Sequence, residues 1–204
     1  MRLTILNEEE IDALYGRPRF TQEARAEYFT LSAREKTALG QFHSLKSRLF
    51  FVLQLGYFKA SRMFFIFGLR EVEKDVAYLV GTYFPEVEDD DAAIAKGTRL
   101  RQQRLILEIC NYRSCDAAMQ KKLHAKARQA ATVYGKPVYV FRELMHSLAE
   151  QRIVAPGYST MQNIVGGALA HEQRRLAGIP KVHVDPSART GSTAPARRQS
   201  RGNL

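Results

Sequence analysis

Basic side chains are the groups of this chain whose number and spacing suit a chemical task, the binding of phosphate. The 204 residues include 31 lysines and arginines against 21 aspartates and glutamates, which gives a net charge of +10. A polyanion binds such a chain favourably because each neutralised phosphate releases condensed counterions. Composition therefore favours nucleic acid as the partner, over an anionic membrane surface or a charge that serves solubility alone.

Two groups of basic residues stand out along the sequence. One brackets an apolar stretch near residue 50, and the other belongs to a run from 96 to 128 that holds nine basic residues and two acidic ones. A solvated helix surface, the plainer interpretation, usually mixes both signs, and Arg101 and Arg104 are spaced to share one helix face. The predicted phosphate contacts are Lys46, Arg48, Lys59 and Arg62 in the first group, and Arg99, Arg101, Arg104 and Arg113 in the second.

A helix-turn-helix motif is predicted between residues 137 and 177. Apolar spacing indicates helices over 137–153 and 159–177, joined by a short turn that contains proline and glycine. The first residues of the second helix meet base edges in this motif, and glutamine or asparagine can pair with adenine. The predicted base contacts are Ser159, Thr160, Gln162 and Asn163. The alternative is that Ser159 and Gln162 form a capping box and Asn163 is solvated.

Residues for metal or covalent chemistry are sparse. Cys110 and Cys115 have four residues between them, which fits neither a redox CxxC pair nor half of a zinc knuckle. The G-x-S-x-G, GxxxxGK[ST], GxGxxG and HExxH patterns are absent, and Arg175 stands where the second histidine would follow His171. We therefore predict no metal site, no cofactor and no catalytic residues. An enzyme without a recognisable motif is the alternative.

Helices are the elements that must position these side chains, because apolar residues recur at helical spacing along most of the chain. The fold class predicted is all-α. Helix starts are indicated by Asn7 with Glu10, Thr21, Ser32 with Glu35, Thr98, Ser114 and Pro137. One helix is predicted over 45–56, and residues 63–67 are interpreted as a buried extended connector.

Two shifts of composition divide the chain. We predict an N-terminal helical module over 1–85, an acidic linker over 86–97, a second helical module over 98–178 and a disordered basic tail over 179–204. Both modules are expected to be of helix-turn-helix type. No apolar run reaches the length of about 18 residues that a spanning helix needs, and the N-terminus has no signal-peptide pattern, so a cytoplasmic location is expected.

Three blocks of the sequence resemble the N-terminal region of Tn3-family transposases. They are LNEEEIDALYG at 6–16, RLFFVLQLGYFKA at 48–60 and EQRIVAPGYST at 150–160, and the resemblance extends from about residue 3 to about residue 178. It implies tandem helical modules that recognise the terminal inverted repeats of a transposon. Members of that family are several times longer, and the resemblance places their metal-dependent carboxylate triad far downstream of anything in this chain.

The resemblance leads to one expected function and several alternatives. The expected function is sequence-specific binding of double-stranded DNA at terminal inverted repeats during DNA transposition, without strand transfer by this chain. In a bacterial cell the chain would associate with the nucleoid when bound, and a homodimer would form through regions it lacks. The alternatives are nonspecific nucleic-acid binding, a helical interaction module, and an inactive remnant of a disrupted transposase gene.

Overall fold

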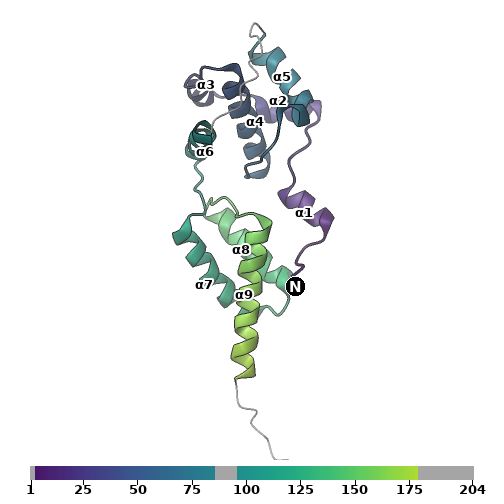
Figure 1. Cartoon of the computed structure of the whole chain (residues 1–204), viewed down its shortest axis with the longest axis vertical. Coiled ribbons are helices and arrows are strands. Elements are labelled where there is room, and N and C mark those ends of the chain that lie inside the picture. The colour runs from purple at the N-terminus through teal and green to yellow at the C-terminus, as the bar shows by residue number, and fades with distance from the viewer. Residues whose placement is uncertain (1–2, 86–95, 179–204) are drawn as a thin grey trace, which may run out of the picture.

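Helices make up most of the chain that the computed structural model describes, which is residues 3–85 and 96–178. These ranges contain nine α-helices, one 3-10 helix and no strand, so the all-α prediction is confirmed. Figure 1 shows the helices in two groups, with α2 to α6 in one and α7 to α9 in the other. Most of the predicted acidic linker, 86–95, and the predicted disordered tail, 179–204, lie outside the described residues.

Local sequence sets several of the helix starts as predicted. The Asn7 side chain accepts a hydrogen bond from the backbone N–H of Glu10, whose carboxylate accepts one from the backbone N–H of Asn7, and Ser32 and Glu35 form the same reciprocal box. Thr21 caps the second helix. The helices of the first group and α1 are α1 Glu8–Tyr15, α2 Gln22–Phe29, α3 Ala33–Leu39, α4 Leu45–Ser61, η1 Leu69–Val72, α5 Glu73–Tyr83 and α6 Lys96–Cys110.

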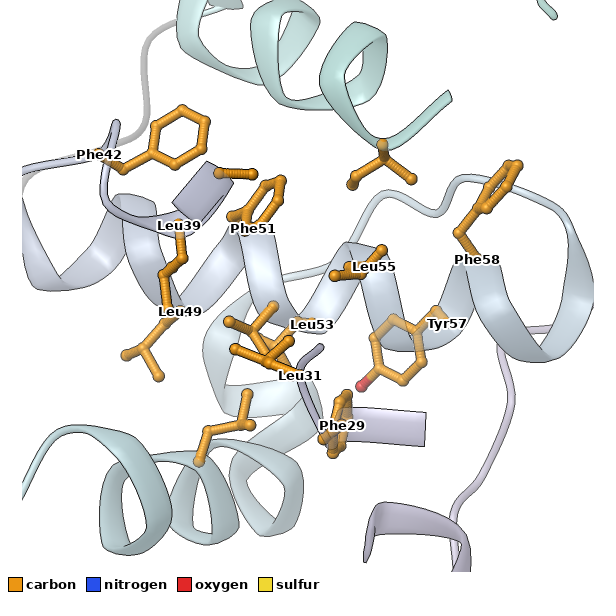
Figure 2. Packing of buried hydrophobic residues seen from close by; sticks show 14 of the residues in the cluster. Phe29, Leu31, Leu39, Phe42, Leu49, Phe51, Leu53, Leu55, Tyr57 and Phe58 are labelled. Carbon is orange, nitrogen blue, oxygen red and sulfur yellow. The ribbon is translucent and has the colours of Figure 1, made fainter. Parts of the chain in front are cut away.

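Helix α4 is the centre of the first hydrophobic cluster. Every residue from 51 to 58 is buried, so α4 is covered on all sides. Figure 2 shows Phe51, Leu55 and Phe58 on one side of this helix and Leu53 and Tyr57 on the other. The neighbours that cover it come from α2, α3, α5 and α6. Because so many aromatic residues are buried here, α4 continues to Ser61 and does not end near residue 56 as predicted.

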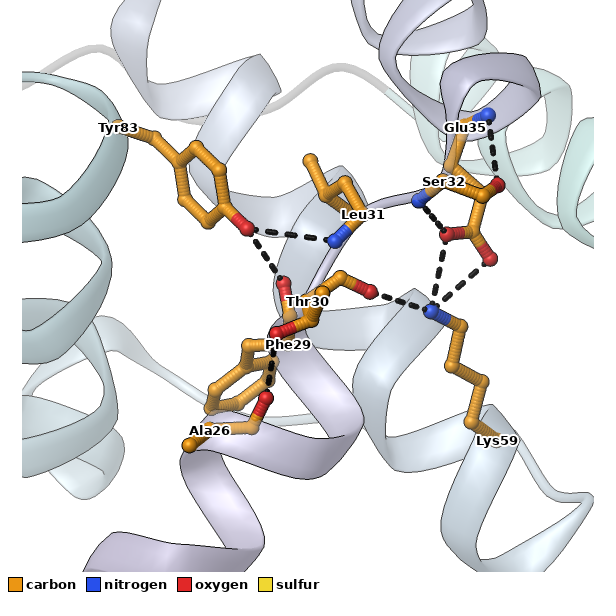
Figure 3. A network of polar contacts seen from close by, with 8 residues as sticks. All are labelled: Ala26, Phe29, Thr30, Leu31, Ser32, Glu35, Lys59 and Tyr83. Atoms are coloured by element: carbon orange, nitrogen blue, oxygen red, sulfur yellow. Dashed lines mark hydrogen bonds and ion pairs between the residues drawn. The ribbon is translucent and has the colours of Figure 1, made fainter.

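A polar network joins the ends of helices around the α2–α3 connection. The Tyr83 hydroxyl donates to the carbonyl oxygen of Phe29 at 3.0 Å and accepts from the backbone N–H of Leu31 at 3.2 Å. Figure 3 shows these bonds beside the contacts that Lys59 makes with Thr30 and Glu35. The connection is therefore fixed to both α5 and α4.

The second hydrophobic cluster combines three C-terminal helices with the N-terminal segment. Ile5 and Leu6 are buried in it, and the Tyr15 ring contacts the rings of Phe141 and Tyr158. Figure 1 shows α1 between the two groups of helices. The three helices are α7 Ala117–Val133, α8 Pro137–Glu150 and α9 Tyr158–Ala177.

The boundary between the two clusters does not coincide with the acidic segment of the sequence. Helix α6, on the far side of that segment, contributes Ile106 to the first cluster, while residues 5 and 6 belong to the second. The chain thus passes between the clusters at 16–20 and again at 111–116. The domain boundaries stay a prediction.

Three predicted helix starts are wrong by one or two residues, and residues 63–67 also differ from their prediction. Helix α9 begins at Tyr158, and its cap residue Gly157 makes no side-chain bond, so the proposed capping box at Ser159 does not form. Helix α7 is capped by Asp116 in place of Ser114, and α6 begins at 96 in place of 98. In the 63–67 connector, Phe67 is buried but Ile66 is 91% exposed.

Candidate nucleic-acid interface

Helix α6 presents the second group of predicted contacts to solvent. Its inner side carries Gln102 and Ile106, and the Gln102 amide donates to the carbonyl oxygen of Ser47 at 2.8 Å, which attaches α6 to the start of α4. Arg99, Arg101 and Arg104 are exposed as a result. The inner face of α6 packs against the first hydrophobic cluster, so these three cations face solvent.

Arg101 is held in place by its neighbours. Its guanidinium donates to the side-chain oxygen of Gln41 at 3.1 Å and lies 5.7 Å from the centre of the Phe42 ring. Neither contact neutralises the charge. Arg101 is therefore ordered at the surface while its positive charge stays available to an anion.

Arg104 and Arg113 come together at the junction of α6 and α7. Both line a hollow of about 430 Å³, together with the carboxylates of Glu108 and Asp116. The backbone of Arg113 is fixed by a bridge in which its N–H donates to Arg152 and its carbonyl accepts from Val154, both at 2.9 Å. The structure thus joins two predicted contacts that are nine positions apart in sequence.

The positive charge continues along α7. Lys121, Lys122 and Arg128 are exposed, and Lys126 pairs with Glu143 at 3.2 Å. Within 3–85 and 96–178, no other basic residue of the 96–128 run forms an ion pair with a carboxylate. We call the exposed cations of these two helices and their junction the α6–α7 surface: Lys96, Arg99, Arg101, Arg104, Arg113, Lys121, Lys122 and Arg128.

The first group of predicted contacts does not form one exposed cluster. Lys59 is used internally, because its ammonium pairs with Glu35 at 2.9 Å. Arg48 is half-buried, with its guanidinium 5.2 Å from the Phe84 ring, and Lys46 is half-buried beside it on α4. Arg62 is exposed at the end of α4 and lies 5.6 Å from the Tyr112 ring. Their binding role stays a prediction.

The start of α9 is partly covered by the N-terminal segment. The Gln162 amide donates to the carbonyl oxygen of Leu3 at 3.0 Å, and Thr160 is half-buried. Ser159 and Asn163 are exposed, and Asn163 lines a hollow of about 560 Å³ beside Leu3. Of the four predicted base contacts, two are therefore accessible and one is already hydrogen-bonded within the chain.

The cysteines are not activated. Burial raises the pKa of the Cys110 and Cys115 thiols above the usual range, and the carboxylate of Asp116 adds to the shift at Cys115. Both are therefore protonated thiols at neutral pH. In the part of the chain that the structure describes, no three His, Cys, Asp or Glu residues are grouped as a metal would require, and no helix is long and apolar enough to cross a bilayer.

Sequence analysis missed a second basic hollow, of about 310 Å³, on the first cluster. Arg17 and Arg19 line it from the segment after α1, and Arg70 and Lys74 from η1 and α5. The two pairs are at least 51 positions apart, and no helical spacing links them. The short Arg-Pro-Arg run at 17–19 is the one local signal.

Comparison with protein families gives one match. The model of a family described as a domain of unknown function, DUF4158, matches residues 5–168. This range starts in the N-terminal segment and ends within α9, so it includes both hydrophobic clusters. No curated protein matches the chain.

Proposed function

The chain belongs to the DUF4158 family, and from that premise we propose that it binds double-stranded DNA through the α6–α7 surface. The bound sites are the terminal inverted repeats of a transposon, as the resemblance to the N-terminal region of Tn3-family transposases implies. Binding serves DNA transposition, and in a bacterial cell it would place the chain on the nucleoid.

One observation carries the proposal, the unneutralised charge of the α6–α7 surface. Eight exposed basic side chains, seven from two successive helices and Arg113 from their connection, have no ion pair with any described residue. Exposed surfaces usually mix both signs because single-sign charge repels itself. The α6–α7 surface, where basic side chains far outnumber the carboxylates of Glu108 and Asp116, instead attracts phosphate, and the resulting contacts fix orientation on a duplex without reading sequence.

Sequence preference requires a separate set of contacts, which we place at the start of α9. Asn163 is exposed there and can pair with adenine through its amide, while Ser159 can reach phosphate. Gln162 is a positioning residue for this set, because its hydrogen bond to the carbonyl oxygen of Leu3 attaches the start of α9 to the N-terminal segment. Because phosphate contacts and base contacts lie on different elements, substitutions on the α6–α7 surface should change affinity, and substitutions at the start of α9 should change sequence preference.

The test is a fluorescence-anisotropy titration of the full chain with an inverted-repeat duplex and a scrambled duplex over a range of salt concentrations. Arg104→Ala with Arg113→Ala should weaken binding to both duplexes equally and reduce the slope of log affinity against log salt by about 0.9 for each phosphate that is no longer neutralised. Lys36→Ala on α3, an exposed lysine outside the α6–α7 surface, is the control. A wild-type chain that binds neither duplex, or a slope that stays unchanged in the double variant, would contradict the proposal.

A nonspecific nucleic-acid-binding module is the second candidate, favoured by the internal use of Gln162. Equal affinity of the wild-type chain for inverted-repeat and scrambled duplexes would select it.

A further inference from the structure

We propose that the basic hollow on the first cluster is a second phosphate-binding site, with Arg19, Arg70 and Lys74 as its ligands. The inference rests on the proposed DNA-binding function and extends it to a face of the molecule that no sequence pattern indicated. We call this site the Arg19–Arg70 hollow. Its charged lining residues are Arg17, Arg19, Arg25, Arg70 and Lys74, with the carboxylates of Glu71, Glu73 and Asp75.

One of the three carboxylates is paired with a cation, and a second is hydrogen-bonded to the backbone. Asp75 is buried, pairs with the Arg25 guanidinium at 2.6 Å and accepts a hydrogen bond from the Tyr57 hydroxyl. The Glu71 carboxylate accepts from the backbone N–H of Gly68 at 2.9 Å, which caps η1. Glu73 is the remaining acidic group, and it is exposed.

The cations are in the opposite situation. Arg19, Arg70 and Lys74 are all exposed, and none of them forms an ion pair with another residue in 3–85 or 96–178. Three unpaired positive charges thus line a hollow that holds five basic residues against three carboxylates, a net charge of +2. The uncompensated charge is positive, so the missing partner is an anion.

Arg17 holds the two sides of the hollow together. Its guanidinium donates to the carbonyl oxygen of Glu71 at 3.1 Å and lies 5.6 Å from the Phe67 ring and 6.0 Å from the Tyr57 ring. Segment 16–20 is thereby attached to η1, although Arg17 and Glu71 are 54 positions apart in sequence. Arg17 is a positioning residue here, and its own charge adds to the field in the hollow.

Phosphate is the anion that this arrangement suits. Arginine forms paired, charge-assisted hydrogen bonds to two oxygens of a phosphate, and lysine adds a point charge. Pro18 restricts the backbone between Arg17 and Arg19, so less backbone freedom is lost there on binding. The phosphate is either a backbone phosphodiester of the DNA held by the α6–α7 surface or a free phosphate compound, and the experiment separates these sources.

The experiment compares the wild-type chain with the triple variant Arg19→Ala, Arg70→Ala and Lys74→Ala in the same duplex titration. If the phosphate belongs to DNA, the variant should bind both duplexes at least several-fold more weakly, with a salt slope lower by about 0.9 for each phosphate left without its cation. Lys36→Ala is the matched control for Lys74→Ala, because it removes one exposed helical lysine from α3, on the other side of α4 (Figure 1). The melting temperature of the variant should not change, since all three side chains are exposed.

A second arm titrates inorganic pyrophosphate while backbone amide resonances are recorded. If the phosphate is free, the amides of residues 68–75 should shift in the wild-type chain and stay unshifted in the triple variant, with duplex binding the same in both. The site is disproved if the variant matches the wild-type chain in both arms. A wild-type chain that binds no duplex refutes the proposed function instead, and the pyrophosphate arm then decides the site by itself.

Discussion

The side-chain amide of Gln162 donates a hydrogen bond to the backbone carbonyl of Leu3 across 159 positions of sequence. Tyr158, one turn earlier on α9, accepts from the backbone N–H groups of Ile5 and Leu6 at 3.4 and 3.1 Å. Together these bonds fasten the N-terminal segment to the start of α9. The amide predicted to read a base is therefore a link between α9 and the N-terminal segment.

Substitution of Gln162 should lower stability, whereas substitution of its neighbour should not. Gln162→Ala removes a half-buried hydrogen bond, so we expect a loss of about 1 kcal/mol in the free energy of unfolding and faster hydrogen exchange at Ile5 and Leu6. Asn163→Ala should leave both unchanged and lower the preference for the inverted repeat at least several-fold, since a base contact is worth about 1–3 kcal/mol. Full preference in a folded Asn163→Ala variant would exclude the helix-turn-helix interpretation.

Lys59 should matter for folding and not for DNA. Lys59→Met keeps the length of the side chain but leaves the Glu35 carboxylate, which is 8% exposed, without its cation. We expect a loss of about 1–3 kcal/mol in the free energy of unfolding by urea, with no change in the salt dependence of duplex binding. Arg34→Ala is the control, because the Arg34–Glu108 pair is exposed and spans 3.8 Å, and its loss should cost less than about 1 kcal/mol. A reduced salt slope in Lys59→Met would show that Lys59 contacts DNA, as the sequence predicts.

Substitution of two helical glycines by alanine should change the stability of the protein in opposite directions. A Cβ atom on Gly56 would lie 2.3 Å from Cδ1 of the buried Phe29 ring, whereas one on Gly167 would meet nothing within 4 Å. Gly56→Ala should therefore lose stability by about 1–3 kcal/mol through overpacking. Gly167→Ala should gain about 0.5–1 kcal/mol through helix propensity. Thermal unfolding of both variants measures the two changes in stability. Equal shifts in their melting temperatures would show that the α2–α4 contact is not tightly packed.

Stability should fall as the pH rises above about 10. Burial raises the pKa of Tyr57 beyond its usual value, and the hydrogen-bonded carboxylate of Asp75 raises it further; burial also raises the pKa of Tyr15. In the unfolded chain both ionise near pH 10, so the unfolded state loses protons that the folded state keeps, and folding weakens above that pH. Below about pH 10 both tyrosines are protonated in the folded and the unfolded state, so their contribution to stability does not change with pH.

Urea unfolding at pH 7, 9 and 10.5 measures this loss, and absorbance at 295 nm reports the tyrosinate that appears on unfolding. Tyr57→Phe should be less stable at pH 7, because Asp75 loses a donor, but should depend less steeply on pH above 10. An identical pH dependence in this variant would place the titration elsewhere.

The sequence by itself determined the all-α class and most helix starts, because these depend on neighbours within four residues. Asn7 with Glu10, Ser32 with Glu35, and Pro137 at the first position of α8 acted as local signals. It also showed the charge of the 96–128 run, since net charge needs no contacts. Base contacts could be selected only by analogy with a motif.

Tertiary structure decided which of those charged and polar side chains remain available. Lys59 meets Glu35 across 24 positions, Arg17 meets Glu71 across 54 and Gln162 meets Leu3 across 159. Helical periodicity tells which face of one helix is apolar, but it carries no information about which helix or segment will cover that face. Packing alone attached α6 to α4, drew the N-terminal segment onto α9, and gathered Arg19, Arg70 and Lys74 around one hollow.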